Sequence, residues 1–495
     1  MRKQMFEFGP FQFDAERSLL LRDGVPVPLG KRSAAILNAL LSHRGEVVDK
    51  ATLMDAAWPG LSVEESNLSV QVAHLRQTLG RTTTGSEWIL TAQRVGYRFA
   101  SRVEAPVTAS CVPEVAIRPF DELGTAVTAR ARGLVEDLTS ALSKFGSIRV
   151  TRRAPIAGDR GRRFDAGAAY VVEGSMRRFA GRLRLNVHLL DGAAGTQLWA
   201  DTVDIGTTAT DDALIGRIAS LLVSQIEMAD TARSRSERPN SESPSDLHRR
   251  ARWLLRPSLE RGNAEAYRLV MQALEMEPEN IHFLATAAEI LHHRGSVGWR
   301  PIGNNDTEQM LDFVDRGMSL GIDDGTAFGL FASALFTARD WDRGRATMER
   351  AIELNPNSSS TLAGAGLCFG WLGLTDLSES YYERVARNGP GDYSYRYAMN
   401  GLAVVNRRRG NHEAAVGFAQ RALAIAPGHS GSHWNLITST VMLGRKKDAR
   451  RYADRFQKVS PTTSVASIEK GQPVADERLL TPVLESLVEA GMPEG

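Results

Sequence analysis

The stretch from Glu65 to Leu79 places the most informative side chains of this chain on one side of a predicted helix. Its apolar residues recur three and four positions apart and form one stripe, at Leu68, Val72, Leu75 and Leu79. The opposite side then carries small or polar residues, namely Ser66, Val70, Ala73, His74 and Gln77. A small, mostly polar outer face suits insertion into a groove, where hydrogen bonding is the chemistry to expect.

Other groups that are able to do chemistry do not form a catalytic or metal-binding set. His429 and His433 lie four residues apart, which can present two imidazoles to a metal ion, but no glutamate or third ligand accompanies them at zinc-protease spacing. We interpret this pair as structural, and we expect His292 and His293 to lie on the surface. The sequence contains neither a phosphate-binding GxxxxGKS/T loop nor a GxSxG elbow. It therefore predicts no metal site, no cofactor and no enzyme activity.

A hydrolase or cyclase in the middle of the chain would need carboxylates positioned to hold a metal ion. The nearest candidates are Asp121, Glu122, Glu136 and Asp137. The last two are adjacent on a predicted helix and face apart, which argues against that activity. Arg152, Arg153 and the RGRR motif at 160–163 form a basic cluster that is typical of a solvated loop, with nonspecific affinity for nucleic acid as the alternative.

Length and composition limit which classes of protein this chain can belong to. At 495 residues the chain is too long for one hydrophobic core, so we expect about three domains. The 60 basic and 58 acidic residues leave a net charge of +2, so any contact with nucleic acid has to come from a local surface. Cys111 and Cys368 lie far apart without metal-site spacing, which fits a reducing compartment. No run approaches the roughly 18 apolar residues of a membrane helix and no signal segment opens the chain, so we expect a cytoplasmic protein without membrane contact.

Two further helices have to hold the Glu65–Leu79 helix in place. The first, from Lys31, turns these residues inward: Ile36, Leu37, Leu40 and Leu41. The second, from about Asp49 to Trp58, turns these inward: Leu53, Ala56, Ala57 and Trp58. Pro59 and Gly60 end the second helix, and a capping box from Ser62 to Glu65 is predicted to start the third.

Short strands flank the three helices. Trp88–Thr91 and Gly96–Phe99 are predicted to form a hairpin with a turn at Ala92–Arg94, in which Gly96 relieves crowding and Arg98 alternates with two inward aromatic residues. Before the helices, the segments FEFGPFQF and SLLLRDGVPVPLG alternate in polarity, with a turn predicted at Asp23–Gly24. A small antiparallel sheet is therefore expected ahead of the helices.

From about Phe6 to Phe99 the chain resembles the winged-helix effector domain of OmpR- and PhoB-type response regulators and of ToxR- and CadC-like activators. The resemblance is carried by VPVPLGKRSAAILNALLSHRGEVVDKATLMDAAWPG, ESNLSVQVAHLRQTLG and RVGYRF. It implies that the third helix enters the major groove of promoter DNA and that the hairpin, the wing, touches the adjacent minor groove or backbone. It also implies that the loop before the third helix faces RNA polymerase.

The resemblance assigns roles to individual residues. It implies base-edge contacts by Ser69, Val70, Ala73 and His74, phosphate contacts by Asn67 and Arg76, and wing contacts by Thr91, Gln93 and Arg94. The polymerase-facing loop consists of Pro59, Gly60, Leu61 and Ser62. Family members commonly carry basic residues where this chain has Ala73 and His74. We therefore expect weak binding by a monomer, so that pairing on repeated half-sites is needed.

The middle of the chain is predicted to be α+β. Strands are expected in VAIRPF, SIRVTR, AYVVEGSMRRF, RLRLNVHLLD and TQLWADTVD, as a meander packed under helices at Arg132–Phe145 and Asp211–Ile226. Linkers are expected at Ala105–Pro113 and Thr231–Pro244. These phrases resemble the TolB-like N-terminal domain, which implies a non-catalytic module for sensing or assembly.

From Ser245 the chain reads as helical repeats. Related phrases end helix pairs, in ALEMEP, AIELNP and ALAIAP, and prolines from Pro356 to Pro461 are spaced by 34, 37 and 34 residues. This is the period of the tetratricopeptide repeat, and six repeats are expected, closed by a C-terminal helix. Small residues are predicted at the helix crossings: Ala332, Gly344, Ala351, Ala403, Ala415 and Ala422.

Together these features predict a multidomain protein: a winged-helix domain at 1–104, a TolB-like α+β domain at 113–230 and an all-α repeat solenoid at 245–495. The order resembles that of HilA-like transcriptional regulators, which implies specific DNA binding by the first domain and signal input, partner binding or self-association by the others. Because no receiver domain is expected ahead of the winged helix, control by phosphorylation in cis is not expected. The alternative is a protein-binding scaffold or adaptor whose winged helix does not bind DNA.

Overall fold

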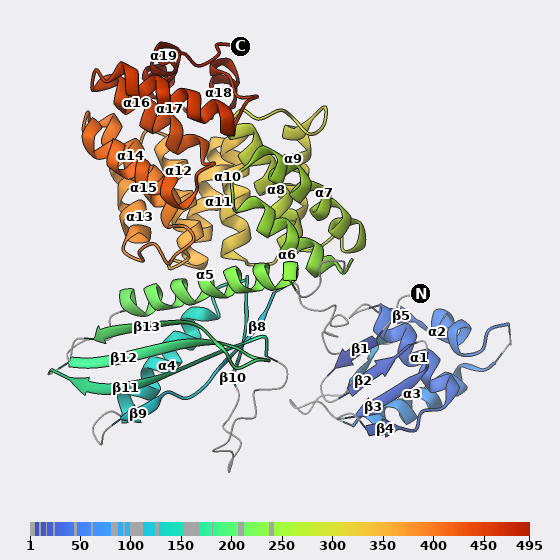
Figure 1. Cartoon of the computed structure of the whole chain (residues 1–495). Coiled ribbons are helices and arrows are strands. Elements are labelled where there is room, and N and C mark those ends of the chain that lie inside the picture. The colour runs from blue at the N-terminus through green and yellow to red at the C-terminus, as the bar shows by residue number, and fades with distance from the viewer. Residues whose placement is uncertain are drawn as a thin grey trace. The chain divides into compact units, whose positions relative to one another are not determined.

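The computed structural model describes residues 5–8, 11–15, 17–22, 25–43, 47–60, 63–80, 88–92, 95–99, 112–123, 128–152, 168–180, 182–205, 212–236 and 242–495. The chain divides into two compact units, Met1–Ser110 and Cys111–Gly495 (Figure 1). No helix in the described ranges is both long and apolar enough to cross a membrane.

The N-terminal unit combines two small antiparallel sheets with three helices. The first sheet has the order β1 (Met5–Phe8), β2 (Phe11–Asp14), β3 (Leu19–Arg22), β4 (Val25–Val27). The helices are α1 (Lys31–Ser42), α2 (Lys50–Ala57) and α3 (Glu65–Leu79). The second sheet has the order β5 (Val47–Asp49), β7 (Gly96–Phe99), β6 (Ile89–Ala92). The wing hairpin is confirmed, and Arg22 pairs with Val25 across the predicted turn, whose Asp23 and Gly24 lie outside the described residues.

The core of this unit follows the predicted helical stripes. All four stripe residues of α3 and all four of α1 are buried, and they pack against aromatic side chains of the first sheet: Phe6, Phe11 and Phe13. Trp88 joins them, with its ring 6.2 Å from that of Phe11 and 6.0 Å from that of Phe99. The domain core is therefore shared between helices and sheet.

Three details of this unit differ from the expectations. Ala56 is exposed, because the buried side of α2 carries Leu53 and Ala57 instead. The predicted capping box is wrong: α3 begins at Glu65, and its N-cap is Glu64, whose side chain makes no capping hydrogen bond, while Ser62 lies outside the described residues. The strand β5 was not expected, since its three residues pair with β7 at long sequence distance.

The second unit begins with a mixed sheet. Its strands are β8 (Glu114–Ile117), β9 (Asp121–Leu123), β10 (Arg149–Arg152), β11 (Tyr170–Phe179), β12 (Arg182–Asp191) and β13 (Gln197–Ile205). The order is β10-β8-β11-β12-β13, with β9 pairing with β11. Only β11, β12 and β13 form the antiparallel meander that was predicted; β8 pairs in parallel with both β10 and β11.

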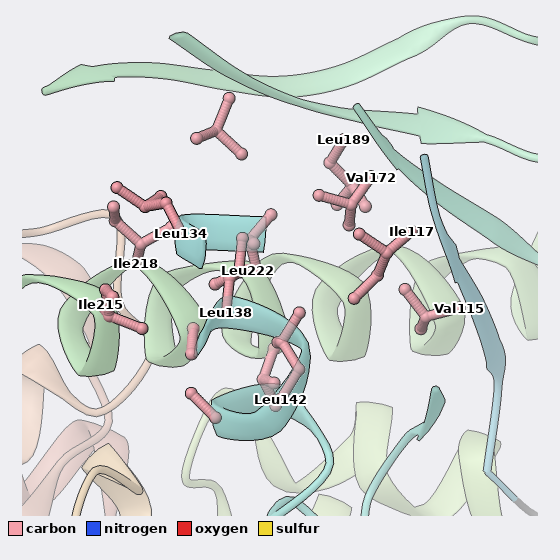
Figure 2. Packing of buried hydrophobic residues seen from close by; sticks show 14 of the residues in the cluster. Val115, Ile117, Leu134, Leu138, Leu142, Val172, Leu189, Ile215, Ile218 and Leu222 are labelled. Atoms are coloured by element: carbon pink, nitrogen blue, oxygen red, sulfur yellow. The ribbon is translucent and has the colours of Figure 1, made fainter. Parts of the chain in front are cut away.

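Two helices cover one face of this sheet, α4 (Thr128–Leu142) and α5 (Asp212–Ser236). Figure 2 shows Leu138 of α4 and Leu222 of α5 directed toward sheet residues such as Val172 and Leu189, and all four are buried. The helix α5 runs ten residues past its predicted end at Ile226, so the first part of the predicted linker is helical. Thr231 supports this extension, because its hydroxyl donates to the carbonyl of Glu227.

Six helix pairs form the C-terminal solenoid, and their short loops make each pair antiparallel. They are α6 (Pro244–Leu255) with α7 (Glu260–Met276), α8 (Ile281–Ser296) with α9 (Asp306–Ser319), α10 (Gly325–Thr337) with α11 (Trp341–Leu354), α12 (Ser359–Trp371) with α13 (Thr375–Ala386), α14 (Tyr395–Arg408) with α15 (His412–Ile425), and α16 (Ser430–Met442) with α17 (Lys446–Val459). The chain then ends with α18 (Val465–Gly471), the 3-10 turn η1 (Glu477–Leu479) and α19 (Thr481–Glu489), which packs into the same hydrophobic cluster as Trp434 and Phe456.

The six small residues predicted at helix crossings are all buried. At Gly344 a Cβ atom would lie 2.8 Å from the Phe336 ring, so a larger side chain would push α10 and α11 apart.

The sheet domain and the solenoid are joined through α5, which lies between them in Figure 1. The hydroxyl groups of Ser220 and Ser359 are 2.6 Å apart, and the side-chain amide of Gln225 donates to the carbonyl oxygen of Gly391 at 2.6 Å. The serine pair is buried, and buried polar groups that are hydrogen-bonded to each other fix the packing of two surfaces. A structural change at this interface is therefore able to affect both the sheet domain and the solenoid.

Candidate nucleic-acid interface

The outer face of α3 presents the side chains that the sequence singled out. Asn67, Ser69, Val70, Ala73 and His74 are all exposed, and Val70 is 62% exposed. They share one side of the helix because the buried stripe on the opposite side faces α1 and the sheets. The structure therefore brings these five residues together on a surface that is small and mostly polar.

Arg76 connects α3 with the wing. Its Nε and Nη2 atoms donate to the carbonyl oxygen of Ile89 at 2.9 and 2.7 Å, and Nη2 also donates to the hydroxyl of Thr91 at 2.9 Å. The guanidinium carbon lies 6.0 Å from the centre of the Tyr97 ring. These contacts hold β6 against the end of α3, so Arg76 positions the wing as well as contributing positive charge there.

A second link between α3 and the wing was missed by the sequence analysis. The hydroxyl oxygens of Ser69 and Tyr97 are 3.5 Å apart, and Tyr97 is otherwise buried. At Gly96, a Cβ atom would lie 1.9 Å from the carbonyl oxygen of Val48, which confirms the crowding expected there. The alternation of Tyr97 and Phe99 around Arg98 predicted that Tyr97 points inward. That pattern does not indicate that the Tyr97 hydroxyl meets Ser69 on α3.

The edge of the interface near the start of α3 carries an ion pair that the sequence analysis also missed. Lys50 Nζ lies 2.6 Å from a carboxylate oxygen of Glu65. This hydrogen bond, together with the charge of Glu65, raises the pKa of Lys50. The two residues are 15 positions apart and belong to different helices, so helical spacing does not reveal the pair. The carboxylate of Glu65 therefore offsets the positive charge of Lys50 at this edge.

The remaining predicted site residues are only partly described. Pro59 and Gly60 are exposed in the turn after α2, where Gly60 has a φ of 73° that favours glycine. Leu61, Ser62, Gln93 and Arg94 lie outside the described residues. Thr91 is exposed on the wing strand β6. Arg98, on β7, is an additional exposed cation.

The histidines of the solenoid have structural contacts. The His429 ring accepts a hydrogen bond from the backbone N–H of Ser432 at 3.2 Å and caps α16, and the His433 ring lies 2.8 Å from the carbonyl oxygen of Pro427. Within the described ranges, no group of three or more His, Cys, Asp or Glu side chains is placed to hold a metal ion.

The prediction that His292 and His293 lie on the surface is wrong for His292, whereas His293 is half-buried. His292 is buried, with its Nδ1 2.6 Å from the hydroxyl of Thr337, and the His293 ring meets the Trp299 ring edge-on at 5.1 Å. Both belong to α8, and the contacts of His292 are with the next helix pairs, to Thr337 of α10 and to the Trp371 ring of α12. Local sequence does not encode such contacts between successive repeats.

The other candidates for chemistry lie on different elements. Glu136 and Asp137 are exposed on α4, and Asp121 is exposed on β9. Cys368 is buried, and burial raises the pKa of its thiol to about 12. Cys111, Arg153 and the RGRR motif at 160–163 lie outside the described residues.

Comparison with known proteins identifies two kinds of domain. Residues 24–99 match the family model described as "Transcriptional regulatory protein, C terminal", and residues 330–393 and 372–430 match the tetratricopeptide repeat. A relative named "Putative adenylate cyclase 3", from Rhizobium meliloti (strain 1021), is 29% identical over 187 residues, which cover 35% of this chain and 32% of that protein. The match thus spans about a third of the length of that curated relative.

Two solved structures are each similar to a part of this chain. The DNA-binding domain of CpxR from E. coli is 22% identical and covers 20% of this chain and 98% of that chain, with a TM-score of 0.19. A tetratricopeptide repeat protein from Parabacteroides merdae ATCC 43184 is 14% identical and covers 53% of this chain and 91% of that chain, with a TM-score of 0.34. From the two family matches and the geometry above, the chain carries an N-terminal winged-helix domain of the OmpR/PhoB type, followed in its C-terminal part by tetratricopeptide repeats.

Proposed function

We propose that this chain is a sequence-specific, DNA-binding transcriptional regulator whose α3 enters the major groove of promoter DNA. The observation that carries the proposal is the exposed, small and polar face of α3, in a domain whose residues 24–99 match a transcriptional regulatory family. A major groove about 12 Å wide admits one α-helix, and a face without bulky side chains allows close approach to the bases.

The proposed contacts divide between bases and backbone. Ser69 and His74 offer hydrogen bonds to base edges, and the exposed methyl groups of Val70 and Ala73 suit contact with a thymine methyl group. Asn67 and Arg76 are assigned to phosphates, which fix the register of the helix. On the wing, we assign the adjacent groove or backbone to Thr91, Gln93 and Arg94.

The charge of the interface favours weak binding by one copy. The outer face of α3 between Ser66 and Gln77 carries no lysine or arginine other than the partly buried Arg76, and Lys50 is paired with Glu65. Each phosphate contact contributes about one unit to the salt dependence of binding, so a small salt slope is expected. We propose that two copies occupy neighbouring half-sites, which raises the effective affinity.

The second unit is proposed to receive the signal that controls DNA binding. We propose that residues 113–230 form a TolB-like module and that residues 245–495 bind a protein partner or a second copy, both without catalysis and in the cytoplasm, where promoter DNA lies. The hydrogen bonds between α5 and the repeats support joint action of the two parts. The exposed turn at Pro59 and Gly60 is proposed to face RNA polymerase. Formation of cyclic AMP from ATP by the purified chain would contradict the non-catalytic part of this proposal.

The test uses the full chain and a fluorescent duplex taken from the DNA upstream of its own coding region. Fluorescence anisotropy is measured over a series of salt concentrations, against a scrambled duplex of equal length. We expect salt-dependent binding that is tighter for the native sequence. His74→Ala should weaken native binding by about 1 kcal/mol, close to fivefold, and leave scrambled binding unchanged.

His43→Ala serves as the matched control, since His43 is exposed at the end of α1 and outside the proposed interface. Equal losses on both duplexes for His74→Ala would contradict the base contact. Folded full-length protein that shows no salt-dependent binding at low ionic strength would refute the regulator and leave the adaptor as the better description.

A further inference from the structure

The inner faces of the repeats line a cavity of about 250 Å³ that is partly open to solvent. Its walls come from α8, α10, α12, α14 and α16, and from the C-terminal segment between Gln472 and Val483. That segment is tied across the solenoid, because the backbone N–H of Ala475 donates to the carbonyl oxygen of Trp371 at 3.0 Å, and the Gln472 side chain donates to the carbonyl of Ser296. The C-terminal segment is therefore a fixed part of the cavity wall.

Arg407 projects into this cavity without a counter-charge. It is only 9% exposed, and its Nε donates to the side-chain oxygen of Asn435 at 3.0 Å. Within residues 242–495 and the other described ranges, no carboxylate pairs with Arg407 and no protein acceptor binds its two terminal amino groups. A buried guanidinium normally finds an anion, since an unpaired buried charge costs several kcal/mol.

The neighbouring charges increase this imbalance. Arg408, which also lines the cavity, uses one amino group on the carbonyl oxygen of Gly370 at 2.8 Å. Burial and the adjacent charge of Arg408 lower the pKa of Arg407 to about 10. Glu289 is the acidic residue in the cavity wall, and it already pairs with Arg252 at 3.4 Å. The walls thus carry excess positive charge.

The rest of the lining indicates the shape of a ligand. The lining also includes apolar side chains, among them Leu367, Val404 and Val474. Trp434 adds a buried indole N–H that has no acceptor among the described residues. An apolar cavity of 150 Å³ holds benzene, so this cavity has room for about ten non-hydrogen atoms.

We propose that the cavity binds a small organic anion, with its carboxylate or phosphate oxygens on Arg407 and an apolar body along the inner helices. A planar guanidinium with free amino groups is matched to either oxyanion, and the Trp434 N–H is able to supply a further donor. The proposal does not depend on DNA binding by the N-terminal unit.

The probes are octanoate, phenyl phosphate and octanamide, added to the full chain during thermal unfolding. Octanoate and octanamide match in size and differ in charge, and phenyl phosphate distinguishes the phosphate from the carboxylate source. We expect at least one of the two anions to raise the Tm by several degrees at saturation, with octanamide giving no comparable rise. If neither anion raises the Tm, or if octanamide matches octanoate, the proposal is overturned; a peptide-binding groove would give this result.

Three variants locate the effect. Arg407→Met should raise the Tm of the unliganded protein, because it removes an unpaired buried charge, and should abolish the response to anion. If Arg407 had only a structural role, Arg407→Met should lower the Tm of the unliganded protein instead. If the methionine variant does not fold, Arg407→Gln decides, since it removes the charge and keeps a polar group beside Asn435. Arg409→Met is the matched control and should respond like the wild type, because Arg409 is exposed and pairs with Asp376 and Glu379. An undiminished response in both Arg407 variants overturns the proposal.

Discussion

Mild acid should destabilise the solenoid through two buried histidines. Burial lowers the pKa of His292 to about 3, and burial with nearby positive charge lowers the pKa of His429 to about 3. Protonation of His429 would also break its cap on α16, since the ring nitrogen has to accept a hydrogen bond from Ser432. In the unfolded chain both rings titrate near 6.5, so below that pH the unfolded state binds protons that the folded state does not. Stability is therefore complete above about pH 6.5 and is lost as the pH falls.

The magnitude follows from the two pKa values. At about pH 5.5 the unfolded state gains about 1.4 kcal/mol for each histidine relative to neutral pH. Together His292 and His429 should lower the free energy of unfolding by about 3 kcal/mol. Asp230 titrates in the opposite sense, because burial raises its pKa to about 6 and its ionisation opposes folding as the pH rises. The test therefore compares how much unfolding free energy the variant and the wild type each lose on acidification.

The variant His292→Gln/His429→Asn removes both titrations. Glutamine keeps a polar partner for Thr337, and asparagine is a good N-cap for α16. Urea unfolding followed by the helical circular dichroism signal, at about pH 7.5 and pH 5.5, gives the free energy at each pH. We expect the variant to lose about 3 kcal/mol less on acidification than the wild type. An equal loss in both proteins would refute the reasoning from buried neutral histidines.

Three further changes test the packing around the sites. Gly96→Ala should destabilise the N-terminal unit by about 1–3 kcal/mol, because the new Cβ meets the backbone of Val48. An unchanged unfolding midpoint for that unit would rule out this close approach. Arg76→Met should lower the free energy of unfolding by about 1–3 kcal/mol, because it leaves the Ile89 carbonyl without its charged donor. It should weaken binding to native and scrambled duplexes alike, and a selective loss on one duplex would argue for a base contact instead. Phe336→Ala should cost about 3–5 kcal/mol in urea unfolding of the solenoid, and a loss below about 1 kcal/mol would show that its pocket collapses.

Local periodicity accounts for the parts of the fold that could be predicted. The stripe on α3 and the small residues of the repeats depend on neighbours three or four positions away, so their burial could be inferred from spacing alone. The same is true of Tyr97 and Phe99, which alternate along one short strand. Helix length was harder to predict. No proline or glycine interrupts α5 between Thr231 and Ser236, and contacts such as the ion pair of Arg233 with Asp191 extend it past its apolar stripe.

Features fixed by distant partners could not be predicted from local pattern. The strand β5 is three residues long and exists through its pairing with β7, including Val48 opposite Tyr97. His292 is polar and adjacent to another histidine in the sequence, and it is buried by contacts with Thr337 and Trp371 on other helices. Exposure on α3 was predictable, whereas the Lys50–Glu65 pair was not, because it joins separate helices.

The most direct test of the central claim is a genome-wide map of the DNA bound in cells by the wild type and by Val70→Glu. Val70 is 62% exposed on the outer face of α3, so glutamate there leaves the fold intact and places a negative charge against the proposed groove. The account predicts discrete promoter sites for the wild type that disappear in the variant at equal protein level. Identical maps for the two proteins, or no enriched sites for the wild type, would contradict it.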